Sequence, residues 1–502
     1  MIPHPNHSIE ELSTIMKWLL SLATVDHGKP KPLKRNDNET PQEDIEIEKS
    51  PGFGLPLEEN HPSYDLINLR KAGFTPYVAG MDVDEAGNLY ISTWDSLGAV
   101  YKLEGIQTAD TSQILITQIA IGLAEPLGLK VVDGEIFVLQ KQELTQLLDH
   151  DKDGITDEYR TISNSWEVST DFHEFAFGLE YSDGYFYASL SLGMRVMRNE
   201  KQKKERGTVI KIKKEDGSIE VLCRGLRTPN GLGFGLDEAL FVTDNQGQWL
   251  PGNKLIHVQE GAFYGNRDGD MDLVAEEIKD TPPAVWLPDN EIANSPSEPI
   301  LIKDVVYKNQ MLYGDVTHGG LKRVFLEKVN GQFQGCVFRH SQGFEAGVNR
   351  LVYGPNGALY VGEVGMNGGW SWKGKQFGLQ QLKYNGKTTF EVLSVSATSD
   401  GFTIEFTERL TDISAITKEA IMMKQWRYEP TIKYGGPKID LQSLEASQLK
   451  WSEDKKTLHL KVEGLKKGHV VYFLFKKDAF KSLREKPLWT GETWYTLNQI
   501  SD

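Results

Sequence analysis

A short apolar strand with an aromatic residue at its centre recurs along the middle of the chain. Each copy follows a turn residue, and successive copies are spaced by about 50 residues, with one longer gap before the fifth. The central aromatic residues are Tyr90, Phe137, Tyr187, Phe241, Tyr313 and Tyr360. Each unit holds further short alternating runs, such as Thr208–Lys213. Four short strands per unit, repeated six times, predict a six-bladed β-propeller over residues 66–388.

The pattern changes after the last repeat. Residues 389–502 alternate between apolar and polar side chains with period two, for example in Phe390–Ala397 and Val470–Phe475. Such runs, separated by polar turns, are typical of a β-sandwich. We therefore predict an all-β chain: the propeller followed by a C-terminal β-sandwich domain of the immunoglobulin-like type.

The first 65 residues differ from the rest. Ser8 and Glu11 form a capping box, and apolar residues from Ile9 to Leu19 follow at helical spacing, so residues 1–24 are predicted to hold one amphipathic helix. Residues 25–65 are rich in Lys, Asn, Glu and Pro and show no apolar periodicity, which indicates a linker. No apolar run is long enough to span a bilayer, and the N-terminal helix does not have the pattern of a signal peptide.

Composition narrows the possible partners. The chain of 502 residues has a formal net charge of −16, which argues against a nucleic-acid partner, because phosphate binding needs concentrated lysine and arginine. Its two cysteines, Cys223 and Cys336, lie far apart in unrelated contexts and form neither a metal motif nor a disulfide framework.

An arginine in a tight turn is the first candidate for a binding residue. Arg227 is followed by Pro229, Asn230 and Gly231, between two predicted strands. Because such a turn fixes its backbone, the guanidinium would be a positioned cation that suits a carboxylate. The structural alternative is an arginine that ties its loop to neighbouring carbonyl groups.

An acidic loop is the candidate metal site. Asp149, Asp151, Asp153 and Asp157 recur at alternate positions around Gly154, an arrangement by which a tight loop wraps oxygens around a calcium ion. The twelfth position holds arginine and not glutamate, so the loop is not an EF-hand. We expect a structural ion; a solvated acidic turn is the alternative.

A histidine and two further cations complete the candidate site. His173 stands beside two carboxylates and among phenylalanines, as a general base would, or as a histidine that bonds a backbone carbonyl would. Lys322 and Arg350 occupy places in later repeats that match that of Arg227. A propeller brings equivalent loops to one end of its central channel, so these groups would form a pocket for a small polyanion beside a base. Scattered surface charge is the alternative.

These motifs resemble those of the glucose/sorbosone dehydrogenases. The matching motifs are His173-x-x-x-x-Gly178, Gly225-x-Arg227-x-Pro-x-Gly231, Gly261-Ala-Phe-Tyr-Gly265, Leu321-Lys322 and Arg350-x-x-x-Gly354. The resemblance covers about 320 residues and implies a soluble quinoprotein that binds pyrroloquinoline quinone (PQQ) and calcium. It implies that His173 takes the hydroxyl proton, with Arg227 as a second catalytic residue. It also implies cofactor binding by Arg227, Asn230, Lys322 and Arg350.

The chain departs from that family in two places. Thr228 follows Arg227 where the family has asparagine, and Gly247–Asn253 replaces the family's acidic calcium stretch. The second departure removes the carboxylate that would hold a calcium ion at the cofactor.

The N-terminus resembles the end of a class I cytochrome c domain. Met1-Ile-Pro-His-Pro5 is similar to the loop that supplies the axial methionine, so the resemblance implies that Met1 is a haem ligand. The haem-attachment motif CxxCH is absent from this chain, so haem c would belong to an upstream domain. The whole resembles propeller proteins of environmental bacteria that are fused to cytochrome c domains; the alternative is a helix that merely caps the N-terminus.

Two functions follow from these patterns. The first is an oxidoreductase that oxidises a sugar or related alcohol through PQQ and passes electrons to a cytochrome c, in the periplasm or outside the cell. The second is a propeller without catalysis that binds glycan or protein, since fold alone does not fix function. A lyase or hydrolase that uses Asp171 and Glu174 is a third possibility.

Overall fold

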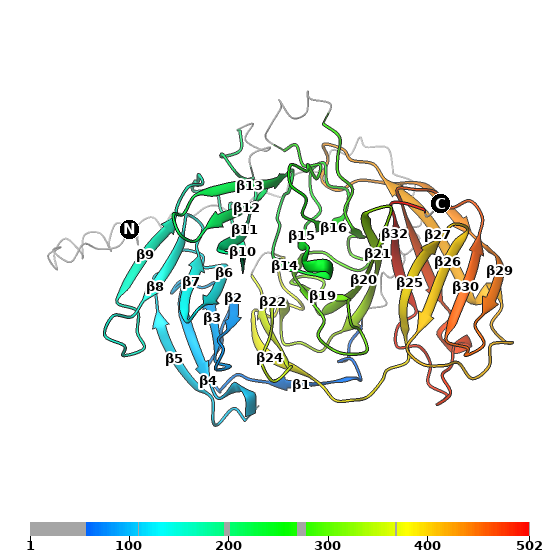
Figure 1. Ribbon diagram of the computed structural model, residues 1–502, viewed down its shortest axis with the longest axis horizontal. Helices are drawn as coiled ribbons and strands as arrows, with labels where there is room; N and C mark the ends of the chain where they lie inside the picture. Colours follow the sequence, from blue (N-terminus) through cyan, green and yellow to red (C-terminus); the bar gives the residue numbers. More distant parts are fainter. Residues whose placement is uncertain (1–56, 109, 195–200, 269–277, 367–368, 501–502) are drawn as a thin grey trace, which may run out of the picture. The chain divides into compact units, whose positions relative to one another are not determined.

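The computed structural model describes residues 57–500, except 109, 195–200, 269–277 and 367–368. The predicted N-terminal helix, Met1 and most of the predicted linker lie outside the described residues. Within them the chain is built of strands joined by turns, with short 3-10 turns such as Ile106–Thr108. The all-β prediction is therefore confirmed (Figure 1).

Strands β1 to β24 form a series of groups of four antiparallel strands, of which β18–β21 are part of a larger sheet and the others are separate sheets. The first sheet holds β2 (Val78–Val83), β3 (Leu89–Thr93), β4 (Val100–Glu104) and β5 (Leu115–Ala120). The second holds β6 (Gly128–Val132), β7 (Glu135–Leu139), β8 (Leu144–Leu148) and β9 (Glu158–Ser163). The third holds β10 (Ala176–Ser182), β11 (Tyr185–Leu190), β12 (Thr208–Lys213) and β13 (Ile219–Arg224).

The later sheets repeat the same order. The fourth holds β14 (Leu232–Phe234), β15 (Leu240–Asp244), β16 (Asn253–His257) and β17 (Val285–Leu287). The next begins with β18 (Pro296–Leu301), β19 (Met311–Asp315), β20 (Leu321–Val329) and β21 (Gln332–Ser341). The last of the series holds β22 (Gly347–Tyr353), β23 (Leu359–Val364), β24 (Phe377–Tyr384) and β1 (Tyr64–Asn68).

The first strands of these sheets pack against one another in order, from β2 through β6, β10, β14 and β18 to β22, and β22 packs against β2. The series therefore closes on itself, which is the arrangement of a β-propeller. Strand β1 pairs with β24, so a segment that precedes the first sheet completes the last one. His61 and Ser63, from the end of the predicted linker, are buried beside it.

The aromatic repeat corresponds to one position in every sheet. The six aromatic residues lie in β3, β7, β11, β15, β19 and β23, each the second strand of its sheet. Four of these strands, β3, β15, β19 and β23, are wholly buried, and β7 and β11 are buried over most of their length, because neighbouring sheets cover both of their faces. Outer strands such as β9 are largely exposed. Near the axis the first strands approach closely: a Cβ on Gly128 would collide with the carbonyl of Gly178.

The C-terminal residues form two sheets around a common apolar core. One contains β25 (Val392–Thr398), β26 (Gly401–Phe406), β30 (Thr457–Val462) and β29 (Ala446–Trp451). The other contains β32 (Glu492–Leu497), β31 (His469–Phe475), β27 (Ile421–Tyr428) and β28 (Lys438–Leu444). Phe402, Phe473 and Tyr495 meet in the core between them.

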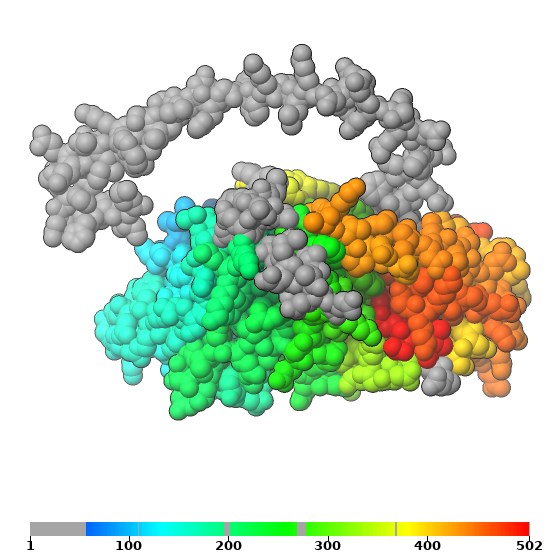
Figure 2. All heavy atoms as spheres, turned by 90° about the horizontal axis from the view of Figure 1, so that it is seen from above, coloured from blue at the N-terminus to red at the C-terminus, as the bar shows by residue number. Residues whose placement is uncertain are grey.

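The second of these sheets continues a propeller sheet. Strand β32 pairs with β21 through Val337 and Trp494, so β18–β21 and the C-terminal strands form one eight-stranded sheet. In Figure 2 the red C-terminal strands lie directly against the yellow-green segment. The sequence pattern predicted a separate domain and gave no sign of this pairing. The immunoglobulin-like type of the C-terminal region stays a prediction.

Candidate functional site

The loop that carries Arg227 is held by a buried carboxylate. This loop joins β13 to β14, and Asp244, at the end of β15, accepts hydrogen bonds from the backbone N–H groups of Arg227 (3.0 Å) and Thr228 (2.7 Å). Burial raises the pKa of Asp244 to about 6. The same kind of hydrogen bond recurs in two later sheets. Asp315 accepts from the backbone N–H of Ser295 (3.1 Å), and Glu363 accepts from the backbone N–H of Ala346. Acidic residues at or near the ends of these three aromatic strands therefore fix the loops that lead into the first strands of their sheets.

His173 is joined to Arg227 through Thr228. The Nδ1 atom of His173 lies 2.6 Å from the carbonyl oxygen of Leu192, and its Nε2 atom lies 3.1 Å from Thr228 Oγ1. Arg227 Nη1 donates to the same Oγ1 at 3.0 Å. Because a carbonyl only accepts, Nδ1 carries the proton; Thr228 accepts from Arg227 and donates to Nε2. Thus Nε2 presents its lone pair toward Thr228.

The environment of His173 keeps the ring neutral. It is 1% exposed, and burial, followed by the positive charge of Arg227, lowers the pKa of His173 to about 4. The rings of Phe172, Phe175 and Trp370 surround it at centroid distances of 5.5–6.1 Å. Phe172 is 56% exposed, so the aromatic wall reaches the surface. His173 therefore bonds a backbone carbonyl, as the structural interpretation expects, and its role as a general base stays a prediction.

This pKa predicts a pH dependence of stability. Between pH 6.5 and about 4 the unfolded chain takes up a proton at His173 that the folded chain does not. The free energy of unfolding should therefore fall as the pH drops through this window, by up to about 3 kcal/mol more than in His173→Asn. Denaturant unfolding at several pH values measures the difference, with the exposed His459→Asn as the matched control. Equal pH slopes for wild type and His173→Asn would contradict the buried neutral histidine.

The side chain of Arg227 is held by its neighbours, and its role as a binding cation stays a prediction. Its side chain packs on Gly247, where an added Cβ would collide with it, and its guanidinium lies 5.0 Å from the ring centre of Tyr434. Tyr434 belongs to the segment between β27 and β28, so the C-terminal region contributes to this part of the molecule. Among the described contacts of the guanidinium, its hydrogen bond to Thr228 uses Nη1 and leaves the other nitrogens available.

Arg350 and Asn230 form a second group. Arg350 is 1% exposed, and its Nη1 donates to Asn230 Oδ1 (3.1 Å) and Asn349 Oδ1 (3.2 Å), while its Nη2 donates to the carbonyl of Leu127 (2.9 Å). Burial lowers the pKa of Arg350, and the nearby carboxylate of Glu298 opposes that shift. The guanidinium therefore links loops of several sheets across the channel.

Lys322 stands apart from both groups. Its Nζ donates to the carbonyl of Gly319 in the loop before β20. Burial lowers the pKa of Lys322 to about 8, and the carboxylate of Asp315 opposes that shift. The structure thus brings His173 together with Arg227, and Asn230 together with Arg350, while no described hydrogen bond or ion pair joins Lys322 to either group.

A small cavity lies between these loops. It has a volume of about 40 Å³ and is lined by Trp94, Phe175, Thr228, Asn230 and Trp370, among others. A water molecule needs roughly 10–15 Å³ of such volume, so the cavity has room for a few waters. Asn245 Oδ1 is buried at this cavity with no hydrogen-bond partner among the described residues. Sequence reasoning missed Asn245, Glu298 and Trp370, and it noted Thr228 only as a departure from the family.

The acidic loop lies elsewhere, between β8 and β9. Carboxylate oxygens of Asp149, Asp151 and Asp153 come within 4.8 Å of one another, and all three residues are exposed. Asp157 is not part of this group; its carboxylate accepts from the N–H of His150 at 2.7 Å. The structure therefore gathers three of the four predicted ligands in an outer hairpin.

The chain is similar to one family model and to several solved structures. Residues 105–285 match a family model described as a domain of unknown function, DUF7133. No curated protein matches the sequence. An oxidoreductase (glucose dehydrogenase) from Thermus thermophilus is similar, with 14% identity and a TM-score of 0.48 over 64% of this chain and 100% of that one.

The names of two similar proteins include PQQ. The PQQ-bound aldose sugar dehydrogenase of Streptomyces coelicolor has 16% identity and a TM-score of 0.46 over 64% of this chain and 99% of that one. The PQQ domain of pyranose dehydrogenase from Coprinopsis cinerea has 10% identity and a TM-score of 0.46 over 64% and 96%. No helix among the described residues is long and apolar enough to cross a membrane.

Proposed function

We propose that the protein is an oxidoreductase that oxidises a sugar or related alcohol at the mouth of its channel. The observation that carries this proposal is the state of His173. Its Nδ1 proton is held by the carbonyl of Leu192, so that Nε2 is left as an acceptor behind a wall of aromatic rings. A neutral buried imidazole with one fixed tautomer is suited to receive a hydroxyl proton.

In this proposal the substrate hydroxyl replaces the Thr228 hydroxyl at His173 Nε2. As the C–O bond becomes C=O, the hydroxyl proton passes to Nε2 and the hydrogen on carbon leaves with its electron pair. PQQ, when bound, would supply the acceptor for that hydride. Thr228 keeps its hydrogen bond from Arg227, so its hydroxyl stays beside the reacting group. Because burial and Arg227 disfavour the protonated imidazole, the ring returns its proton readily to solvent after the step.

The residues at the mouth fit PQQ in two respects. The available nitrogens of Arg227 suit a carboxylate, and the unpartnered Oδ1 of Asn245 suits the pyrrole N–H. We therefore propose that Arg227, Thr228 and Asn245 would hold the cofactor. Arg350 and Lys322 donate to acceptors of the protein itself, and we propose that they hold the channel loops.

Four finer features belong to the same proposal. Each four-stranded sheet of the closed series is one blade, which gives a six-bladed propeller completed by β1. The loop of Asp149, Asp151 and Asp153 holds a structural calcium ion. Electrons leave the reduced cofactor for a cytochrome c, in a fused domain or a partner. The protein works in the periplasm or outside the cell.

One observation favours a second candidate, a propeller that binds glycan or protein without catalysis. The cavity between the loops is small, at about 40 Å³, and Arg350 and Lys322 are already engaged by the protein. A channel closed in this way would leave the aromatic wall around Phe172 as a binding surface.

Titration of the purified protein with PQQ and Ca²⁺, followed by absorbance, separates the two candidates. We expect saturable binding that Arg227→Gln weakens by about tenfold or more, because a charge-assisted hydrogen bond is lost. The exposed Arg224, three residues earlier, provides the matched control Arg224→Gln, which should bind like wild type. A folded wild-type protein that does not bind PQQ would favour the binding candidate.

A further inference from the structure

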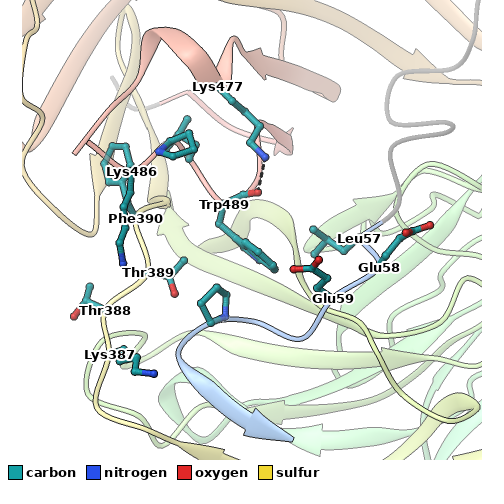
Figure 3. Close-up of a pocket in the computed structure, with 13 residues that line it drawn as sticks. Leu57, Glu58, Glu59, Lys387, Thr388, Thr389, Phe390, Lys477, Lys486 and Trp489 are labelled. Atoms are coloured by element: carbon teal, nitrogen blue, oxygen red, sulfur yellow. Dashed lines mark hydrogen bonds between the residues drawn. The ribbon is translucent and has the colours of Figure 1, made fainter. Parts of the chain in front are cut away.

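A cavity of about 500 Å³ lies outside the channel, at a seam between three segments (Figure 3). The segments are the residues before β1, the residues between β24 and β25, and the loop before β32. This volume lies in the range of small-molecule sites and far exceeds that of the cavity beside Thr228. We call it the seam cavity.

Trp489 forms a rigid apolar surface in the seam cavity. Its indole Nε1 donates to the carbonyl of His340 (2.9 Å), its backbone N–H donates to the carbonyl of Phe390 (2.9 Å), and its own carbonyl accepts from Lys477 Nζ (3.0 Å). Figure 3 shows the indole between Thr389 and Glu59. Since its polar atoms are engaged by the protein, the ring presents its carbon face, against which the C–H face of a sugar ring packs well.

A buried polar cluster supports this tryptophan from behind. The ring of His61 lies 5.6 Å from that of Trp489, edge to face, and stacks on His340 at 4.3 Å. His61 Nδ1 accepts from the N–H of Ser63, so Nε2 carries the proton and donates to Glu391 (2.9 Å). A metal on Nε2 would require the opposite tautomer, because Nδ1 would then face Ser63 with a proton of its own. The cluster thus fixes the wall and is not a metal centre.

Three lysines and two glutamates, Glu58 and Glu59, line the seam cavity, so lysines are in slight excess. Lys387, Lys477 and Lys486 line it, in a chain whose net charge is −16. Lys387 and Lys486 are exposed, and no ion pair of either is seen among the described residues. Glu59 and Thr388 add a hydrogen-bond acceptor and a hydroxyl. Lysines beside an aromatic platform suit a carboxylate on a ring, and the acceptor and hydroxyl suit ring hydroxyls.

We infer that the seam cavity binds a sugar that bears a carboxylate, of the uronic acid type. The sugar ring packs on Trp489, its carboxylate pairs with Lys387 and Lys486, and its hydroxyls bond Glu59 and Thr388. This site is separate from His173 and does not depend on catalysis there.

Calorimetric titration with glucuronate, glucose and benzoate tests this inference. Glucuronate and glucose differ only in the carboxylate, and benzoate carries a carboxylate on a ring without hydroxyls. We expect glucuronate to bind at least about tenfold more tightly than either, and Lys486→Met to weaken it by about tenfold. The exposed Lys450→Met, in β29, is the matched control and should bind like wild type.

Three results would overturn it: glucose or benzoate binding as tightly as glucuronate, no glucuronate binding at all, or an unchanged affinity in Lys486→Met. Lys486 is exposed, so its substitution should leave folding intact. His173→Asn should keep glucuronate affinity unchanged, which distinguishes failure of the seam site from failure of the proposed channel chemistry.

Discussion

His173→Asn should lower kcat for sugar oxidation by about 10²–10⁴-fold, the usual contribution of a positioned general base. Asparagine can still bond the carbonyl of Leu192, but it provides no basic nitrogen toward Thr228. Because His173 is assigned no contact with the cofactor, PQQ affinity should stay within about twofold of wild type. Steady-state dye reduction over a panel of aldoses and polyols measures kcat.

The exposed His459→Asn in the C-terminal region serves as the control and should keep wild-type turnover. If His173→Asn turned over sugar at the wild-type rate, His173 would be a structural histidine and the base would have to be sought elsewhere. If it lost PQQ affinity as well, its role would be to shape the cofactor site.

Arg350→Met should destabilise the fold by about 1–3 kcal/mol, the cost of leaving buried hydrogen-bond acceptors without a donor. The substitution removes the donors that bond Asn230 and Leu127, and it removes one of the positive charges that act on the buried Glu298. Urea unfolding measures the loss. Arg427→Met is the matched control, because Arg427 pairs with Glu429 at the surface and its loss should cost about 1 kcal/mol or less.

A different outcome would support the cofactor-binding role that the sequence resemblance implies for Arg350. If Arg350→Met were as stable as wild type but bound PQQ poorly, the guanidinium would be a cofactor contact. Urea unfolding and PQQ titration of Arg350→Met together therefore decide whether Arg350 holds the channel loops or binds the cofactor.

The propeller type of the fold could be predicted because one strand in each unit carries a strong local pattern. Tyr90 and Phe241 stand in second strands that are buried on both faces, so their apolar runs are continuous and easy to recognise. The pairing of β1 with β24 and of β32 with β21 could not be predicted, because each joins segments far apart in sequence.

The candidate site was predicted less completely. Residue types and turn positions placed His173 and Arg227, and the structure joins them through Thr228. Lys322 and Arg350 occupy matching places in the repeat, but a sequence does not show which acceptors a buried cation will find. The role of Asp244 had a visible signal, since an acid closes the aromatic strand in three repeats.

The central claim is that His173 takes a proton from a sugar or alcohol while the hydride passes to a bound quinone. A single-turnover experiment without oxygen or dye tests it most directly: protein loaded with PQQ and Ca²⁺ is mixed with an aldose, and the cofactor absorbance is followed. We predict rapid reduction in wild type and reduction about 10²-fold slower or more in His173→Asn. Tight PQQ binding in wild type with no reduction by any sugar or polyol of the panel would contradict the claim.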